Sequence, residues 1–373
     1  MRIVRLANFV TPRSGGLRTA LLQLGEGYQA HGHEAILVVP GTRPSDERTA
    51  AGRVITVVGV RVPGTGGYRV IVSRRRLRTL LAELAPDRVE VSDRSTLRWI
   101  GDWARERAVP SVMVSHESLH GLLGVVGLPR WAQRRLADYA NARTARTYDT
   151  VVCTTSWAGA DFRRIGAANL VQVPLGVDLD TFHPKLCDEL VRRRFAGPGQ
   201  LLLVHCGRLS TEKRPTRSVE ALAALRSAGV DAVLVVAGGG PLRARLERQA
   251  AGLPVHFVDF VADRRALATL LATADVALAP GPAETFGLAA LEALACGTPV
   301  VVDRASALPE VVGEAGLAVR GDGAAFARGV RELLTRGEES RRRDARAQAE
   351  RFSWDRSVKG FLATHGLRPQ EVR

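Results

Sequence analysis

Short apolar segments alternate with longer segments of helical pattern along the first half of the chain. The apolar segments are rich in Val, Ile and Leu and are bounded by polar or turn-forming residues, which is typical of buried parallel strands. They cover residues 3–9, 35–39, 54–60, 88–91, 112–115, 151–154 and 171–174. This alternation predicts a parallel sheet wrapped by helices.

A second series of the same kind begins at residues 201–206 and continues at residues 232–237, 255–258, 276–279 and 298–302. Between the two series, residues 178–200 contain Pro184, a Gly-Pro-Gly turn and a run of three arginines, which indicates a connection between domains. We therefore expect an N-terminal α/β domain over residues 1–177, a connector over 178–199 and a second α/β domain over 200–351. The last segment, residues 352–373, is expected to form a helix that packs back on the N-terminal domain.

The composition supports two domains but does not decide the partner. A chain of 373 residues with 46% hydrophobic content can bury two cores. The formal charge of +15 suits nucleic acid or an anionic surface. However, only three of the 53 basic residues are lysine, and this preference for Arg, beside abundant Ala, Gly and Val, is typical of a GC-rich genome. No nucleic-acid-binding motif is present, so we expect no nucleic-acid partner.

The spacing of the cysteines and the length of the apolar runs indicate in which cellular compartment the protein is expected. Four cysteines, at positions 153, 187, 206 and 296, lack the paired spacing of a zinc site or redox pair. Reduced thiols in a cytoplasmic protein are the expectation. The first apolar run is too short for a signal peptide, and no run reaches the roughly 18 residues that a membrane span needs. Any membrane contact is therefore expected from the surface.

Residues 281–298, with the sequence GPAETFGLAALEALACGT, place two carboxylates around a predicted helix start. A Pro-Gly-Pro turn follows the strand 276–279, and residues 286–295 are rich in helix-forming Leu and Ala. Glu284 then lies just outside the helix. Glu292 lies one to two turns in, and its side chain leans back towards the same opening.

The start of this helix is a candidate anion site. The backbone N–H groups of Phe286, Gly287 and Leu288 have no partner within the helix and carry partial positive charge. An anion site between two carboxylates that can bind hydroxyl groups suits a nucleotide-sugar, with phosphate at its centre and a sugar on either side. The alternative is an ordinary amphipathic helix with two solvated glutamates.

Two cations follow the strand 201–206, in the loop GRLSTEKRP. Arg208 and Lys213 are thereby placed at the carboxyl end of a strand, the edge at which open parallel sheets bind ligands. Arg offers a fixed fork of donors to phosphate and Lys a movable charge, so the pair could neutralise a diphosphate without a metal. The alternative is a basic surface loop. Gly238-Gly239-Gly240, after the next strand, allows a tight turn and close approach of the backbone.

Two features of the first half could also face a ligand. Gly15 and Gly16 come between the first strand and the helix 17–30, where bare N–H groups can approach a phosphate. The full G-x-G-x-x-G pattern of an ordinary nicotinamide site is absent. The strand 112–115 delivers His116 to its carboxyl end, with Glu117 and His120 beside it. His116 could bind a sugar hydroxyl or a developing charge, although a structural histidine is the alternative.

The helix predicted over residues 73–84 carries an apolar stripe of four leucines next to four arginines, Arg74, Arg75, Arg76 and Arg78. This pattern is typical of a helix lying on an anionic membrane. It also suits any helix that covers a sheet. Elsewhere, Asp178-Leu179-Asp180 imitates a metal-binding D-x-D motif, but it falls in the connector, so no metal is expected there.

Taken together, these residues resemble the retaining glycosyltransferase family 4. The resemblance spans nearly the whole chain and is carried by the Gly-Gly turn, PLGVDLDTFHP at 174–184, GRLSTEKRP at 207–215 and ETFGLAALE at 284–292. Within the family, the chain looks most like the actinobacterial GDP-mannose-dependent α-mannosyltransferases of phosphatidylinositol mannosides and related glycolipids. That closer likeness is carried by NFVTPRSGGLRTA at 8–20, VCTTSWA at 152–158 and the segment 277–299.

The resemblance implies the GT-B fold, in which two Rossmann-like domains with parallel sheets face a central cleft. The N-terminal domain would bind the acceptor and the C-terminal domain the nucleotide-sugar. Arg208 and Lys213 would hold the diphosphate, Glu292 the ribose and Glu284 the hydroxyls of the transferred sugar. The amides of residues 286–288 would help to position the sugar and the diphosphate.

The remaining implied roles concern the base, the facing domain and the chemistry. The base would be bound by backbone near residues 259–261, including Val261. Gly15 and Gly16 would approach the phosphate, and His116 would lie near the sugar. Transfer would retain the α configuration and need neither cofactor nor metal, with a phosphate oxygen accepting the proton. His116, Arg208, Lys213 and Glu284 would form the catalytic set.

Several functions stay open at this point. The acceptor could be a phosphatidylinositol mannoside, a glucuronosyl diacylglycerol or a small soluble polyol, and the donor could be a UDP-sugar instead of GDP-mannose. A nucleotide-sugar epimerase on the same two-domain plan is a rival enzyme, and a nucleic-acid binder is a rival without catalysis. A lipid acceptor would place the protein in the cytoplasm, in peripheral contact with the inner face of the plasma membrane.

Overall fold

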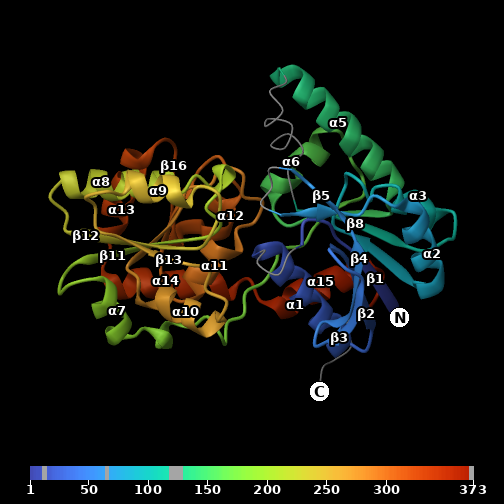
Figure 1. Ribbon diagram of the computed structural model, residues 1–373, viewed down its shortest axis with the longest axis horizontal. Coiled ribbons are helices and arrows are strands. Elements are labelled where there is room, and N and C mark those ends of the chain that lie inside the picture. The colour runs from blue at the N-terminus through green and yellow to red at the C-terminus, as the bar shows by residue number, and fades with distance from the viewer. Residues whose placement is uncertain (11–14, 64–66, 117–128, 369–373) are drawn as a thin grey trace. The chain divides into compact units, whose positions relative to one another are not determined.

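The structure is a computed structural model that describes residues 1–10, 15–63, 67–116 and 129–368. The chain forms two compact units (Figure 1). The first contains Met1–Gly176 together with Trp354–Arg373, and the second contains Val177–Ser353. Each unit is built around its own sheet.

The first unit contains an eight-stranded sheet in the order β10-β9-β8-β7-β1-β2-β4-β3. All neighbouring pairs are parallel except β3 and β4, which are antiparallel. The strands are β1 (Arg2–Leu6), β2 (Glu34–Gly41), β3 (Ser45–Thr49), β4 (Gly52–Val58), β7 (Arg88–Val91), β8 (Ser111–Ser115), β9 (Thr150–Cys153) and β10 (Leu170–Gln172). A separate antiparallel pair consists of β5 (Val60–Arg61) and β6 (Arg69–Val70).

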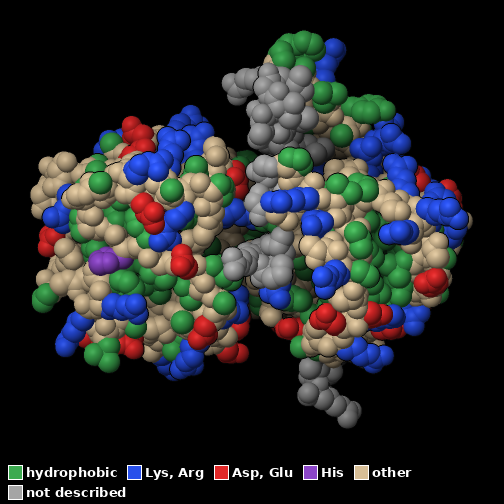
Figure 2. All heavy atoms as spheres, viewed as in Figure 1, with side chains coloured by type: hydrophobic (Ala, Val, Ile, Leu, Met, Phe, Trp, Pro, Cys, Tyr) green, Lys and Arg blue, Asp and Glu red, His purple; other side chains and the backbone are tan. Residues whose placement is uncertain are grey.

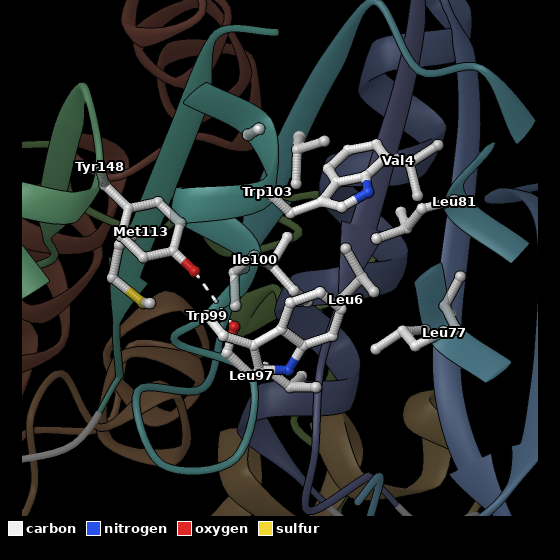
Figure 3. Packing of buried hydrophobic residues seen from close by; sticks show 14 of the residues in the cluster. Val4, Leu6, Leu77, Leu81, Leu97, Trp99, Ile100, Trp103, Met113 and Tyr148 are labelled. Atoms are coloured by element: carbon white, nitrogen blue, oxygen red, sulfur yellow. Dashed lines mark hydrogen bonds between the residues drawn. The ribbon is translucent and has the colours of Figure 1, made fainter. Parts of the chain in front are cut away.

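Six helices are described beside this sheet in the first unit. They are α1 (Gly16–Ala30), α2 (Arg74–Leu84), α3 (Ile100–Arg105), α5 (Arg130–Thr147), α6 (Ser156–Arg164) and α15 (Trp354–Thr364). Leu77 and Leu81 of α2 lie in one core cluster with Val4 and Leu6 of β1, as Figure 3 shows. The leucine stripe predicted over residues 73–84 therefore packs inside the unit.

The last helix, α15, packs on α1. Gly27 of α1 has no side chain, and a Cβ at this position would clash with Val358 of α15. The Arg88 Nε donates to the His365 carbonyl oxygen at 2.9 Å, and the His365 ring lies 3.3 Å from the buried Glu90 carboxylate. Apolar packing and polar contacts thus join the end of the described chain to the first unit.

The second unit contains a six-stranded parallel sheet in the order β13-β12-β11-β14-β15-β16. Its strands are β11 (Leu201–Cys206), β12 (Ala232–Ala237), β13 (Val255–Val258), β14 (Val276–Ala279), β15 (Val300–Asp303) and β16 (Leu317–Val319). Its α-helices are α7 (Glu189–Phe195), α8 (Thr216–Ser227), α9 (Arg243–Gln249), α10 (Arg264–Thr273), α11 (Leu288–Ala295), α12 (Leu308–Val312), α13 (Gly323–Leu334) and α14 (Glu338–Glu350). Three 3-10 turns are η1 (Pro184–Leu186), η2 (Thr211–Lys213) and η3 (Gly313–Ala315).

Most boundaries differ little from the sequence-based expectation, and the differences have local causes. The strand expected over residues 54–60 is split at Gly59: residues up to Val58 pair with β2 as β4, and Val60 begins β5, which pairs with β6 instead. The strand expected to begin at Thr298 begins at Val300, since the Thr298 hydroxyl bonds the Leu271 carbonyl at 2.6 Å. β3 was not expected, because its sequence SDERT is charged and mostly exposed.

Basic side chains lie over the visible surface of both units and are mixed with acidic ones (Figure 2). On this face they do not gather into one continuous stripe. No helix within the described residues is long and apolar enough to cross a membrane.

Candidate functional site

Loops from neighbouring strands of the second unit meet at the carboxyl edge of its sheet. Strands β11 and β14 are hydrogen-bonded neighbours, and each leads into a loop that carries predicted site residues. The Lys213 ammonium group, at the end of η2, forms an ion pair with the Glu284 carboxylate, which precedes α11. Both side chains are more than half buried. The structure therefore brings together two residues that lie 71 positions apart in the sequence.

The close approach of these two loops depends on Gly281. A Cβ at this position would lie 3.2 Å from the Lys213 Cα and 3.5 Å from Glu284 Oε1. The first distance is shorter than an ordinary contact, so a side chain at residue 281 would require the Lys213 backbone to move by a few tenths of an ångström, whereas the second is an ordinary contact. The Pro-Gly-Pro turn seen in the sequence thus sets the distance between the two charged residues.

Arg208 lies on the same loop as Lys213 and is only partly exposed. Its Nη1 atom lies 3.9 Å from Glu212 Oε1. Burial lowers the pKa of Arg208 below its usual value, but a guanidinium remains charged at any physiological pH. The loop therefore holds two cations, and each of them lies beside one carboxylate.

The glycines after β12 support this loop from the other side. The Leu209 N–H donates to the Gly239 carbonyl at 3.0 Å, and the Leu242 N–H donates to the Leu209 carbonyl at 2.9 Å. Gly238 and Gly240 have φ angles of +142° and +158°, and a Cβ at either would clash with the backbone of the Arg208 loop. The glycines at residues 238 and 240 thus allow their backbone to pack closely against the backbone of the loop that carries Arg208.

Glu292 is the fifth residue of α11, and its side chain is 10% exposed. Burial raises the pKa of Glu292 to about 7, while the nearby Arg264 guanidinium acts in the opposite direction. Arg264 Nη2 donates to Glu292 Oε1 at 3.2 Å. The Arg264 guanidinium also lies over the Phe182 ring, 4.7 Å from its centroid.

Helix α11 begins at Leu288, two residues later than predicted, because Gly287 has a φ of +83°. A Cβ at Gly287 would clash with the Leu308 side chain. Phe286 is buried, and its ring contacts that of Phe352 edge to face. The amides of Phe286, Gly287 and Leu288 donate no hydrogen bond to another described residue. These three N–H groups therefore keep the anion-binding capacity expected of a helix start.

The predicted base-binding segment is the loop between β13 and α10. Val261 lies there and is partly buried. Asp263 caps α10 by accepting from the Arg265 N–H at 2.9 Å, and the almost fully exposed Asp259 pairs with Arg243 at 3.2 Å. The role of Val261 stays a prediction.

In the first unit, His116 follows β8 and its Nε2 atom lies 3.2 Å from the Ser92 hydroxyl. Burial lowers the pKa of His116 to about 4, so its ring is neutral near pH 7. Gly15 and Gly16 lie at the start of α1, where both are exposed and a Cβ at Gly15 would meet no atom within 4 Å. Glu117, His120 and Ser14 lie outside the described residues.

The four arginines predicted to contact a membrane are all exposed on α2. Arg74 and Arg78 lie over the Trp99 ring, with their guanidinium carbons 5.9 and 5.3 Å from its centroid. In the connector, Asp178 accepts from the N–H groups of Asp180 and Thr181 and so closes a local turn. Among the described residues, no group of three or more His, Cys, Asp or Glu could hold a metal ion.

Family models match most of the chain. A "Glycosyl transferase 4-like domain" matches residues 15–176, and "Glycosyl transferases group 1" matches residues 200–336. The chain is also 56% identical over 375 aligned residues to the "GDP-mannose-dependent alpha-(1-6)-phosphatidylinositol dimannoside mannosyltransferase" of Mycobacterium tuberculosis, covering 100% of this chain and 98% of that protein. The chain belongs to the group 1 glycosyltransferases. The expected fold class, GT-B, is confirmed.

More distant relatives of this glycosyltransferase agree with that assignment. This chain is 33% identical over 306 residues to the "D-inositol 3-phosphate glycosyltransferase" of Geodermatophilus obscurus, covering 73% of this chain and 65% of that protein. The solved structure of sucrose-phosphate synthase from Thermosynechococcus elongatus superposes with a TM-score of 0.77 at 21% identity, covering 98% of each chain. At that identity the superposition shows the fold alone.

The glycosyltransferase also contains supporting residues that the sequence did not reveal. Arg264 holds Glu292, and Arg217 forms a buried ion pair with Asp303 while donating to the Pro280 carbonyl at 3.3 Å. Both arginines lie at the start of a helix, Arg217 as the second residue of α8 and Arg264 as the first of α10, which is the signal that could have found them. In a chain with this many arginines, that signal does not separate them from surface residues.

Proposed function

We propose that this glycosyltransferase transfers mannose from GDP-mannose to phosphatidylinositol dimannoside and forms an α-(1-6) linkage. The observation that carries the proposal is the 56% identity over the whole chain to a protein named for that reaction. The grouping of Arg208, Lys213, Glu284 and Glu292 at one sheet edge supports a nucleotide-sugar as the donor. The donor is a substrate, and the proposal includes no cofactor.

We assign the donor to the second unit. Arg208 and Lys213 would bind the diphosphate, and Lys213 would at the same time keep Glu284 in position for the hydroxyls of the mannose. Glu292 would accept hydrogen bonds from the ribose hydroxyls, with Arg264 holding its carboxylate. The guanine would lie at the loop between β13 and α10, near Val261.

The proposed chemistry is electrostatic. As the bond between mannose and phosphate stretches, negative charge grows on the diphosphate. Arg208, Lys213 and the amides at the start of α11 are already in place to stabilise that charge. The acceptor hydroxyl attacks from the face that the diphosphate leaves, so the α configuration is retained, and a phosphate oxygen accepts its proton.

The first unit is assigned to the acceptor. His116, whose ring is neutral near pH 7, would form a hydrogen bond with a hydroxyl group of the mannose. The backbone amides of the exposed Gly15 and Gly16 would approach the diphosphate. The exposed arginines of α2 would make peripheral contact with anionic lipid at the inner face of the plasma membrane. Because Leu77, Leu81 and Leu84 of α2 are buried, this contact would be electrostatic and would not insert the helix.

A second candidate is transfer to a small soluble acceptor. The 33% identical relative is named for D-inositol 3-phosphate, which carries no acyl chain. The lower identity and smaller coverage of that match make it the weaker candidate.

The test is a transfer assay with purified protein, GDP-mannose and phosphatidylinositol dimannoside, followed by linkage analysis of the product. We expect one added α-(1-6)-linked mannose, much slower transfer from UDP-sugars and no product from D-inositol 3-phosphate. Transfer to D-inositol 3-phosphate alone, or an epimerised sugar nucleotide without acceptor, would contradict the proposal.

A further inference from the structure

A cavity of about 500 Å³ lies in the first unit between α2 and the edge strands β3 and β4. This volume is within the roughly 300–1,000 Å³ range of small-molecule sites. The cavity is lined from both sides of this helix-on-sheet layer. Its apolar walls are Ile55 and Val57 of β4, Ile71 before α2, and Leu77 and Leu80 of α2.

The lining offers no unpaired acidic group to a ligand. Ile55 and Val57 are two positions apart in one strand and so project on the same face of the sheet. The acidic lining residue, Asp46, is bound by Arg53 through two hydrogen bonds of 2.8 and 2.6 Å. The cavity therefore suits a hydrocarbon more than a polar ligand.

The mouth of the cavity differs from its walls. Val58 lines the cavity and is 51% exposed, and Val72, between the lining residues Ile71 and Ser73, is 54% exposed. Arg76 also lines the cavity, and it is exposed on α2 beside Arg75. An apolar interior with a cation at its opening is complementary to an amphiphile with an anionic head.

We propose that this cavity binds one acyl chain of the phosphatidylinositol dimannoside acceptor, with Arg76 facing the lipid phosphate. The inference rests on the proposed function, which makes the acceptor a phospholipid. It adds a site that recognises the hydrocarbon, separate from the charged contact of α2 with the membrane surface. It also explains why the helix buries Leu77 fully but leaves Leu80 only partly covered.

The test fills the cavity and compares two acceptors. Leu80→Trp places a large ring in the cavity, and Thr79→Trp, at the neighbouring exposed position of α2, is the matched control. Each protein is assayed in detergent with diacyl phosphatidylinositol dimannoside and with the same headgroup after deacylation. The readout is the ratio of kcat/KM for the two acceptors.

Because each buried methylene strengthens binding several-fold, we expect the wild type to prefer the diacyl acceptor by about tenfold or more. Leu80→Trp should remove most of that preference without changing kcat/KM for the deacylated acceptor, and Thr79→Trp should keep it. A wild type without the preference, or a Leu80→Trp variant that retains it, would overturn the acyl site. Failure of the wild type to use either acceptor would instead overturn the proposed function.

A second measurement covers the case in which Leu80→Trp does not fold. Wild-type protein is photo-crosslinked to an acceptor with a diazirine in one acyl chain, and the labelled peptides are identified. Labels on residues 52–58 or 71–80 support the site, and labels confined to other segments overturn it. If Leu80→Trp changes the sedimentation of the protein but not the acceptor ratio, the cavity is a contact between two copies of the chain and the proposal is wrong.

Discussion

The two candidate ligand regions of this glycosyltransferase are built differently. At the sheet edge of the second unit, charged side chains are held by ion pairs, and glycines set the approach of their loops. The cavity of the first unit has apolar walls and one arginine at its opening. A diphosphate is recognised by fixed charge and a hydrocarbon by an apolar cavity, so the contrast matches the two substrates of the proposed reaction.

The largest effect is expected from removing a cation of the second unit. Lys213→Ala should lower kcat by about 10²–10³-fold or more, because one preoriented group that stabilises the leaving charge is lost. The matched control is Lys185→Ala, since Lys185 is exposed on η1 of the same unit. Steady-state kinetics with GDP-mannose measure both. Equal loss in the two variants would remove the special role of Lys213.

One glycine from each unit tests how far the local backbone tolerates a side chain. Gly287→Ala should lower the free energy of unfolding by about 1–3 kcal/mol, because residue 287 has a positive φ and its Cβ would clash with Leu308. Gly15→Ala should lower stability less than Gly287→Ala, since Gly15 has a negative φ and a Cβ there would meet no atom within 4 Å. Thermal unfolding compares the two. If Gly15→Ala weakens GDP-mannose binding without loss of stability, the proposed approach of Gly15 to the diphosphate gains support.

The sequence was a better guide to the second unit than to the first. Arg208, Lys213, Glu284 and Glu292 were predicted because charged residues at strand ends and helix starts stand out against apolar strands, and the structure places Lys213 and Glu284 in contact. The acyl cavity was not predicted, because Ile55, Val57 and Leu80 have the pattern of ordinary core residues. Only the three-dimensional packing shows that they leave a space.

The same contrast applies to the fold. Parallel strands such as Leu201–Cys206 and Ala232–Ala237 were predicted to the residue, since they are buried on both faces and read as continuous apolar runs. β3 was missed, because a charged edge strand is stabilised by its antiparallel partner β4 and not by burial. The late start of α11 depends on the φ of one glycine, which composition alone does not reveal.

The raised pKa of Glu292 in the second unit predicts that the KM for GDP-mannose depends on pH. Burial raises this pKa to about 7, so the carboxylate is lost as the pH falls below 7 and the ribose loses an acceptor. The KM for GDP-mannose should rise by up to about fivefold between pH 7 and pH 6, because the ionised fraction of Glu292 falls from about one half to about one tenth. Arg264→Gln should move the change to higher pH, and Glu292→Gln should remove it. A KM independent of pH in the wild type would contradict the role of Glu292.

This raised pKa also affects stability, with a definite sign. Between pH 4.5 and about 7 the folded state holds the Glu292 proton more tightly than the unfolded state, so the contribution to stability falls as pH rises through that window. Glu292→Gln should therefore gain stability relative to the wild type at pH 8 and lose that advantage at pH 5. Chemical denaturation at the two pH values measures the difference.

The smallest effect is expected at the exposed arginines of α2. Arg75→Ala should weaken binding to anionic vesicles by about fivefold, because one cation near an anionic surface contributes about 1 kcal/mol. Arg245→Ala, at an exposed position of α9 in the second unit, is the control and should change binding little. Vesicle sedimentation at fixed salt compares the variants. If both variants bound anionic vesicles equally weakly, the net charge of the protein, and not the position of Arg75 on α2, would account for the binding.

The central claim is that the carboxyl edge of the second sheet binds the diphosphate of the donor. A crystal structure of the protein with GDP tests it most directly. The account predicts the two phosphates against Arg208 and Lys213 and the ribose hydroxyls on Glu292. A GDP molecule bound elsewhere, with these three side chains free of it, would contradict the account.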